Sequence, residues 1–389
     1  MFGSSRVDRR EFIKSASASA ALLAAGYRLQ KPVAGWAAPR NHTGDIRMRV
    51  LEYAVLAPSS HNTQPWLVEL AAEGMKLFVD RSRLLTAADP QGRQAYISQG
   101  TFLEMLEIAA HQFGYRADLT YFPGGKYAED AAEDRPVAAI ALQPDSMIVP
   151  DPLFAEIPSR QTNRRPYQLT RTPSLEELAA MRSAPQSTAI DWRITGNAAQ
   201  LQAVEGICEE AMTIEVSSEV RNREMATWFR FSDSELRKRG DGVGIAQGGT
   251  EGAKKWIAET FVLSRARAAA SAGIFARGAI AQAKEQAASA PVFAALVTEG
   301  NSRLDQVLAG RAYARVNLTA SRLGLAMQPM SQAEEEYTEM AELRQRLKQA
   351  LHVPDGQTVQ MLFRLGFARP SAPSPRREPA TLIHGQVTG

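Results

Sequence analysis

One loop of the sequence concentrates side chains that could bind a polar ligand. Residues 59–66 read Ser-Ser-His-Asn-Thr-Gln-Pro-Trp and follow a predicted helix end at Ala57-Pro58. Hydroxyls and amides beside a tryptophan can hydrogen-bond a polar heteroaromatic ring and a polyol chain. The simpler interpretation is a well-bonded turn ahead of a buried Trp66. We expect His61 to be a solvated loop histidine and not a catalytic acid.

Two clusters of arginine could bind a phosphate group. Residues 160–167 read Arg-Gln-Thr-Asn-Arg-Arg-Pro-Tyr, and Arg376-Arg377 follow Pro375 in the tail. A guanidinium presents a planar fork of donors that suits a phosphate dianion, and several converging forks make a strong site. Taken alone, each cluster is more typical of a solvated surface patch.

Other chemistries lack their motifs. The five histidines have no metal-ligand spacing, no GxSxG elbow occurs, and Cys208 has no second cysteine to pair with. The run Gly240-Asp241-Gly242-Val243-Gly244 lacks the Lys-Ser/Thr of a phosphate loop and follows no predicted strand. The sequence therefore predicts no hydrolase, no metal site and no catalytic side chain.

The composition is that of a globular protein, with 44% apolar and 22% charged residues in 389. The net charge of +3 comes from the first 37 residues, where six Lys and Arg face only Asp8 and Glu11. The rest is close to neutral, so we expect no nucleic-acid partner. No apolar run is long enough for an integral membrane segment.

Residues 1–37 are typical of an export signal. Arg9-Arg10 precede Phe12-Ile13-Lys14, and the stretch from Ser15 to Gly26 is rich in Ala, Ser and Leu. The pattern resembles a twin-arginine signal, with Asp8 where Ser or Thr is usual. We expect export by the twin-arginine machinery to the periplasm or the cell exterior. The alternative is an amphipathic N-terminal helix on a cytoplasmic protein.

Hydrophobic periodicity predicts the elements around the polar loop. We expect helices over 46–56, 94–113 and 174–182 and strands over 67–70, 75–80 and 135–142. Gly114 ends the second helix.

A weak internal repeat indicates a duplication. Gly100 and Gly114, which lie within and just after one predicted helix, are matched by Gly310 and Gly324 around another. Ala57-Pro58 followed by Trp66 is matched by Ala184-Pro185 followed by Trp192. A weaker match pairs the strand 136–140 with 291–296. Between the halves, about 197–290 is rich in helix-forming residues and is predicted to be an inserted helical lid. The Pro- and Arg-rich tail from 369 is expected to be an extended arm.

The loop and the arginine motifs together resemble the FMN-dependent nitroreductase superfamily. Residues 57–66 resemble its flavin-binding signature, and Arg160-x-Thr162-x-Arg164 resembles its Arg-x-Ser-x-Arg phosphate motif. Asp89-Pro90-Gln91-Gly92-Arg93 and the ending Leu365-Gly366-Phe367 are similar to the duplicated, single-chain branch named after mycobacterial Acg. The likeness covers roughly residues 45–380.

The resemblance implies an α+β nitroreductase-like fold of two fused halves, 45–160 and 160–389, a pseudo-dimer in one chain and therefore a monomer. The signature loop occurs only in the first half and the arginine motif only ahead of the second, so one FMN site is expected. The resemblance implies that the flavin ring and ribityl chain contact Ser59, Ser60, Asn62 and Gln64. It implies that the phosphate contacts Arg160, Thr162, Arg164, Arg376 and Arg377. The segment near the reactive flavin nitrogen would be Gln328, Pro329 and Met330.

Two functions follow from the resemblance. The first is an FMN-dependent oxidoreductase that moves electrons from a small-molecule donor, with NAD(P)H as the candidate, to a nitroaromatic, a quinone or a similar acceptor. The second is a flavin storage protein whose lid covers the ring. Export disfavours the first, because NAD(P)H is a cytoplasmic reductant. A third interpretation is a flavin-fragmenting oxygenase of the same superfamily.

Overall fold

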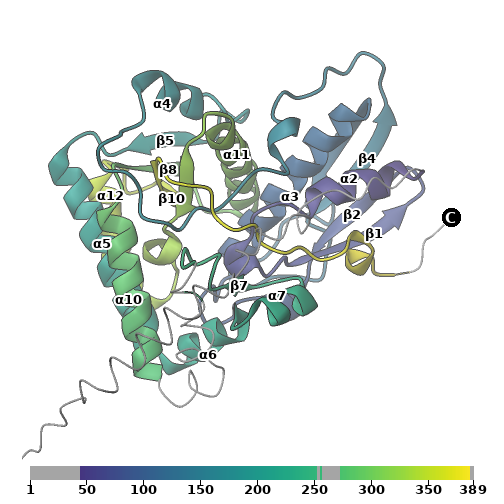
Figure 1. The fold of residues 1–389 in the computed structure, drawn as a ribbon. Helices are drawn as coiled ribbons and strands as arrows, with labels where there is room; N and C mark the ends of the chain where they lie inside the picture. The colour runs from purple at the N-terminus through teal and green to yellow at the C-terminus, as the bar shows by residue number, and fades with distance from the viewer. Residues whose placement is uncertain (1–43, 252–254, 256–271, 386–389) are drawn as a thin grey trace, which may run out of the picture. The chain divides into compact units, whose positions relative to one another are not determined.

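Two four-stranded antiparallel sheets form the framework of the protein (Figure 1). The computed structural model describes residues 44–251, 255 and 272–385, all within one compact unit, Trp36–Gly389. The predicted export signal, 1–37, lies outside the described residues. Among the described helices, none is long and apolar enough to cross a membrane.

The first sheet has the strand order β1-β2-β4-β3 and the second has the order β5-β8-β10-β9. The strands of the first are β1 (Trp66–Ala71), β2 (Gly74–Val79), β3 (Tyr115–Tyr121) and β4 (Ala138–Pro144). Those of the second are β5 (Asp191–Ile194), β8 (Val292–Thr298), β9 (Ala326–Pro329) and β10 (Thr358–Gly366). The predicted α+β class and its two-half architecture are confirmed.

The elements of the two halves follow the same order along the chain. Helix α2 (Ile46–Ala54) precedes β1 as α4 (Leu175–Arg182) precedes β5, and α3 (Arg93–Gln112) follows β2 as α11 (Arg303–Arg322) follows β8. This correspondence pairs β4 with β10 and β8 with β2. The predicted match between 136–140 and 291–296 is therefore wrong, because these segments occupy different places in their sheets. The internal duplication itself stays a prediction.

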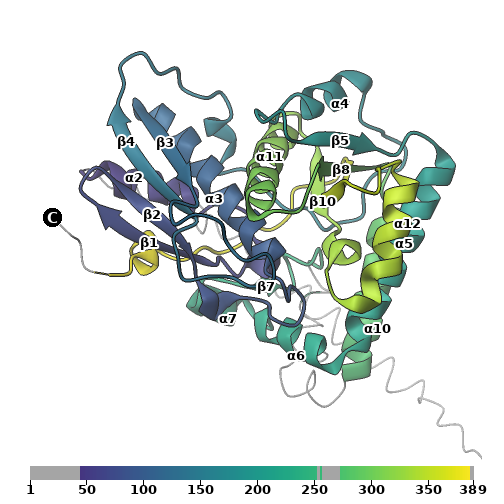
Figure 2. The same cartoon turned by 180° about the vertical axis from the view of Figure 1, so that it is seen from behind.

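Two central helices join the halves. Helices α3 and α11 pack against each other between the two sheets, as the views from both sides show (Figure 2). Val307, Ala314 and Leu318 of α11 lie in the core of the first half. Helix α3 is buried along nearly its whole length because both halves cover it.

The helical insertion lies between β5 and β8, where the first half has only the turn between β1 and β2. Its helices are α5 (Ala198–Ser217), α6 (Glu219–Trp228), α7 (Asp233–Arg239) and α10 (Ala272–Ala288), and the short strands β6 (Phe229–Arg230) and β7 (Val243–Gly244) pair in parallel. Helix α12 (Ala341–Ala350) of the second half packs against α5. The predicted helical character of 197–290 is confirmed for the described residues.

The tail returns from the second half to the first. After β10 it has no regular element until a short 3-10 helix at Pro379–Leu382, and Ile383 forms a bridge with Val68 of β1. We call residues 369–385 the C-terminal arm. Proline at four positions between 370 and 379 removes backbone donors and prevents a helix there.

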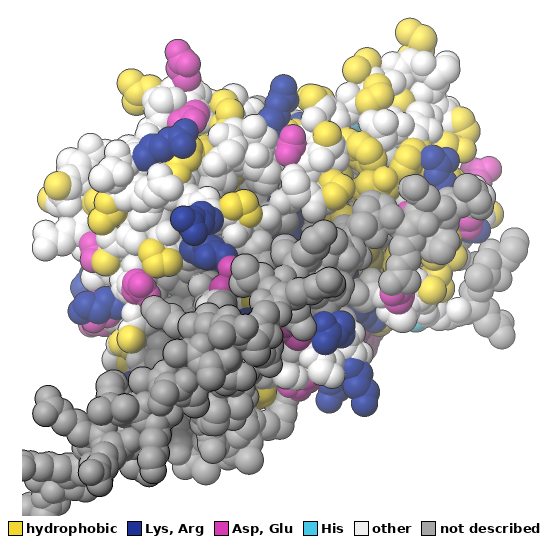
Figure 3. All heavy atoms as spheres, viewed as in Figure 1, with side chains coloured by type: hydrophobic (Ala, Val, Ile, Leu, Met, Phe, Trp, Pro, Cys, Tyr) yellow, Lys and Arg dark blue, Asp and Glu magenta, His cyan; other side chains and the backbone are white. Residues whose placement is uncertain are grey.

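Charged side chains are spread over the visible face of the described residues. In Figure 3, Lys and Arg side chains alternate with Asp and Glu and form no continuous basic stripe.

Candidate functional site

The polar loop after α2 has a strained backbone. His61, Asn62 and Gln64 have φ values of 48°, 54° and 53°, in the left-handed region that side chains disfavour. Such strain persists only where the surroundings impose it, and it is common at ligand sites. The hydroxyl of Ser59 helps to hold the loop by accepting a hydrogen bond from the Gln64 backbone N–H at 3.0 Å.

The Asn62 and Gln64 side chains tie this loop to the insertion and to the C-terminal arm. Asn62 Nδ2 donates to the carbonyls of Gly242 and Pro375 at 3.0 and 3.1 Å. Gln64 Nε2 donates to the Gly240 carbonyl at 2.9 Å, and its Oε1 accepts from the Arg377 N–H at 2.7 Å. Three segments far apart in sequence therefore meet at this loop.

His61 lies in the loop as expected and is partly buried, so it is less solvated than a free surface histidine. Burial and the nearby Arg164 guanidinium lower the pKa of His61 to about 4, which keeps the ring neutral at physiological pH. Its Nδ1 lies 3.2 Å from the Ser60 hydroxyl. His61 therefore adds no positive charge to the neighbouring arginines.

Arg160 and Arg376 converge beside the loop. Each donates from Nη2 to the same acceptor, the carbonyl oxygen of Leu56 at the end of α2, and both distances are 3.3 Å. Arg160 also donates to Asn317 Oδ1 at 2.9 Å, and Arg376 to Asn62 Oδ1 at 3.0 Å. The two like charges thus lie within two hydrogen-bond lengths of each other.

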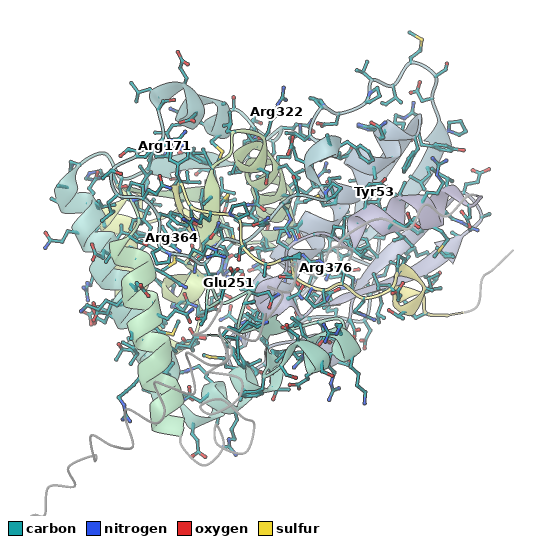
Figure 4. The ribbon with its side chains drawn as sticks, viewed as in Figure 1. Tyr53, Arg171, Glu251, Arg322, Arg364 and Arg376 are labelled. Atoms are coloured by element: carbon teal, nitrogen blue, oxygen red, sulfur yellow. The ribbon has the colours of Figure 1, made fainter. Side chains whose placement is uncertain are left out.

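These arginines lack a negative partner. Among the described residues, no carboxylate forms an ion pair with Arg160, Arg164 or Arg376, and the Nε atoms of Arg160 and Arg376 have no hydrogen-bond partner. Burial lowers the pKa of Arg160 to about 10, and burial together with Arg160 lowers the pKa of Arg376 to about 9. A bound anion would relieve this electrostatic cost. Figure 4 labels Arg376 on the arm.

Two further arginines differ from these three. Arg165 forms an ion pair with Glu251, and Arg377 lies 3.4 Å from Asp80 and also donates to the carbonyls of Gln64, Trp66 and Thr381. The Arg377 guanidinium thus bonds to other groups of the protein, and these bonds do not support its predicted contact with a phosphate. Thr162 lies between Arg160 and Arg164 and stays partly exposed.

The third predicted segment, Gln328, Pro329 and Met330, lies at the end of β9. The Gln328 side chain is buried and bonds to Gln286 and to Arg364 of β10. The Met330 N–H donates to the Leu362 carbonyl at 2.8 Å, and proline has no N–H to offer. The contacts of this segment within the described residues are therefore structural.

Sequence reasoning missed the residues that complete the cluster from other elements. Asn317 and Tyr313 of α11 and Gln247 of the insertion contact or approach the arginines. Their positions gave no signal, because a helix residue and a loop glutamine have no motif. No group of His, Cys, Asp and Glu in the described ranges could hold a metal ion.

The chain is similar in sequence to two mycobacterial proteins. It is 29% identical over 361 residues to the putative NAD(P)H nitroreductase Rv3131 of Mycobacterium tuberculosis, a match that covers 90% of this chain and 94% of that protein. It is 35% identical over 81 residues to the putative NAD(P)H nitroreductase acg of the same organism, covering 21% and 24%. The chain resembles the nitroreductases.

Other comparisons add less. No family model matches the chain. A putative nitroreductase from Anabaena variabilis shares 12% identity and a TM-score of 0.43, covering 85% of this chain and 90% of that one. A nitroreductase with bound FMN from Bacteroides fragilis shares 16% identity and a TM-score of 0.31, covering 56% and 89%. The long match to the mycobacterial nitroreductase spans both halves of the fold.

Proposed function

We propose that the chain binds FMN and acts as a nitroreductase-like oxidoreductase. The observation that carries the proposal is the anion site, which we define as Arg160, Arg164 and Arg376 beside the 59–64 loop. Partly buried guanidiniums with no carboxylate partner among the described residues suit a phosphate dianion, whose oxygens accept several charge-assisted hydrogen bonds at once. The names of the mycobacterial relatives support the oxidoreductase assignment.

The residues present fit the phosphate end of FMN better than its ring end. Arg160 Nε and Arg376 Nε are unpartnered donors of the kind a phosphate would satisfy. Asn62 and Gln64 already bond within the protein, so we assign their side chains to tying the loop to the insertion and the arm. Ser59, Ser60 and His61 keep accessible surface and remain the candidates for direct ring or ribityl contact.

When bound, the flavin would supply the redox chemistry, taking a hydride from a reduced nicotinamide and passing electrons to a nitroaromatic, a quinone or a similar acceptor. The chain's residues would bind the phosphate, orient the ring through the strained loop and limit access of water. The positive charge of the three arginines in the anion site would also favour a negatively charged ligand nearby. This scheme requires no catalytic side chain.

A second candidate, flavin storage, is favoured by the contacts of the insertion. The segment Gly240–Gly249 bonds to the loop through Gly240 and Gly242 and to Arg164 through the Gln247 carbonyl. The same glutamine donates to the Pro373 carbonyl of the arm at 2.7 Å. A lid tied down on both sides would slow exchange of a bound flavin and restrict the entry of substrates.

Export by the twin-arginine route and a monomeric state belong to the proposal as well. The fused halves would supply both sides of the site within one chain. The export machinery carries folded proteins, so FMN could be bound before export. A size measurement of the purified chain and fractionation of cells that express it, with and without residues 1–37, would test these two points.

The decisive experiment is the visible spectrum of the protein after incubation with FMN and removal of free flavin, followed by anaerobic addition of NADPH. We expect a bound flavin band that bleaches with NADPH and returns with a nitroaromatic or a quinone. A bound flavin that NADPH leaves oxidised but dithionite reduces would favour storage. Failure to bind FMN at all would reject both functions.

A further inference from the structure

Tyr313 has a buried hydroxyl that no described group satisfies. The side chain is 2% exposed, it lies on α11 in the second half, and its Oη has no hydrogen-bond partner. The ring packs edge-on against Phe363 of β10, with 5.9 Å between centroids. A buried phenol usually bonds through its hydroxyl, so an unsatisfied one calls for an absent partner.

The helix that carries Tyr313 contacts the anion site. Arg160 and Arg164 both act electrostatically on Tyr313, and Asn317, one helical turn further along α11, accepts a hydrogen bond from Arg160 at 2.9 Å. Residues four apart on a helix share a face, so α11 presents Tyr313 and Asn317 on the same side.

Tyr167 is a useful contrast. It is also buried and close to Arg164, but its hydroxyl donates to the Asn163 carbonyl at 2.9 Å. Tyr313 has no such carbonyl. Burial raises the pKa of Tyr313 despite the two nearby arginines, so the phenol stays protonated and can donate.

We propose that the Tyr313 hydroxyl is a ligand-binding group that donates a hydrogen bond to a phosphate oxygen of the bound ligand and so contributes to selectivity for a phosphorylated flavin. This inference rests on the proposed function and adds a residue from α11 to a site otherwise built from the 160–164 segment and the arm. The hydroxyl and the two Nε donors, which have no partner among the described residues, come from three separate segments, as suits a group with several acceptor oxygens.

The test compares the binding of FMN, riboflavin and inorganic phosphate to the full chain, to Tyr313→Phe and to Tyr96→Phe. Tyr96 is the matched control, because it is a fully buried tyrosine on α3 whose ring lies under Arg303 and not at the anion site. Flavin binding is followed by quenching of flavin fluorescence, and phosphate binding by the rise in unfolding temperature.

We expect Tyr313→Phe to weaken FMN binding about tenfold, to leave riboflavin binding unchanged and to reduce stabilisation by phosphate. Tyr96→Phe should change none of the three. Equal weakening of FMN and riboflavin, or unchanged FMN binding, would overturn the inference while the proposed function stands. If Tyr313→Phe does not fold, the unmodified chain still tests the inference, because equal affinity for FMN and riboflavin would overturn it.

The two proposals can fail separately. If phosphate stabilises the full chain through Tyr313 but FMN does not bind, the hydroxyl's role in the anion site stands and the proposed function fails. If the full chain binds neither phosphate nor FMN, both are rejected.

Discussion

Arg160 and Arg376 donate to one carbonyl oxygen, that of Leu56, although 216 positions separate them in the chain. Helix α2 ends two residues earlier, at Ala54, and the C-terminal end of a helix favours positive charge near it. A single carbonyl cannot balance two guanidiniums, and the Nε atoms of both remain unpartnered. The fold thus keeps like charges together at a cost that an anionic ligand would remove.

Replacing Arg376 by Gln should therefore separate stability from binding. We expect the ligand-free protein to keep or gain stability, because a partly buried charge without a carboxylate partner among the described residues is removed. FMN affinity should fall at least about tenfold. Thermal unfolding of the apo protein and flavin titration measure the two effects.

The adjacent Arg377 is the matched control for that prediction. Because Arg377 bonds to Asp80 and to three carbonyls, Arg377→Gln should destabilise the apo protein by about 1–3 kcal/mol. If both variants lose stability alike, Arg376 is a structural residue and the anion site is not supported.

The close approach of α3 and α11 predicts that Gly100 cannot be replaced. A Cβ on Gly100 would lie 1.9 Å from the Val307 carbonyl oxygen, and one on Gly310 would lie 2.0 Å from that of Ile97. Gly100→Ala should lower the free energy of unfolding by about 1–3 kcal/mol, since the helices must move apart. Urea unfolding measures the change.

Gly206→Ala on α5 is its control. Nothing lies within 4 Å of a Cβ at this exposed helical position, so alanine should raise stability by about 0.5–1 kcal/mol. Equal effects at the two glycines would contradict the tight helix crossing.

A third prediction concerns the hold of the insertion on the first half. Asp241 is buried and bonds to Arg83 at 2.9 Å and to Arg230 at 2.5 Å. If this segment is a lid, Asp241→Asn should speed the release of bound FMN by about tenfold or more, since Arg230 loses its carboxylate partner and Arg83 keeps only Asp80. Stopped-flow dilution measures the release rate.

Glu210→Gln serves as the comparison in the same insertion. Glu210 pairs with Arg346 at the surface, and such pairs contribute little. The Glu210→Gln variant should release FMN at the same rate as the unmodified chain. Unchanged release in Asp241→Asn would show that this contact does not govern exchange.

The buried Glu334 predicts how stability varies with pH. Burial, which outweighs the nearby Arg93, raises the pKa of Glu334 from 4.5 to about 8. An acid whose pKa is raised in the folded state stabilises the fold at low pH, and this contribution is lost as pH rises from about 4.5 through 8. Glu334→Gln cannot ionise and should be more stable at pH 8 by about 1–3 kcal/mol.

Denaturant unfolding between pH 5 and 9 checks this prediction, with Glu299→Gln at an exposed position as the control. The Glu334 variant should give a flatter profile than the unmodified chain, and the control an unchanged one. A parallel shift of the whole profile would show that ionisation of Glu334 does not matter.

The sequence by itself determined the local elements and the candidate ligand groups. Periodicity predicted the bounds of α2, α3 and α4 to within a few residues, because the apolar spacing and end signals of an amphipathic helix lie within its own short stretch of sequence. It missed β3 and shifted the start of β4 by three residues. Strand positions depend on partners distant in sequence, which periodicity does not encode.

Only the tertiary structure decided which of the predicted site residues face one another. In sequence, Arg376 and Arg377 are equivalent, yet the arm directs one towards Arg160 and the other towards Asp80. Tyr313 had no motif, and the helix that carries it, α11, packs closely on α3 at the paired glycines Gly100 and Gly310. Charge and hydrogen-bonding type belong to each residue, but pairing and burial arise only when distant segments pack together.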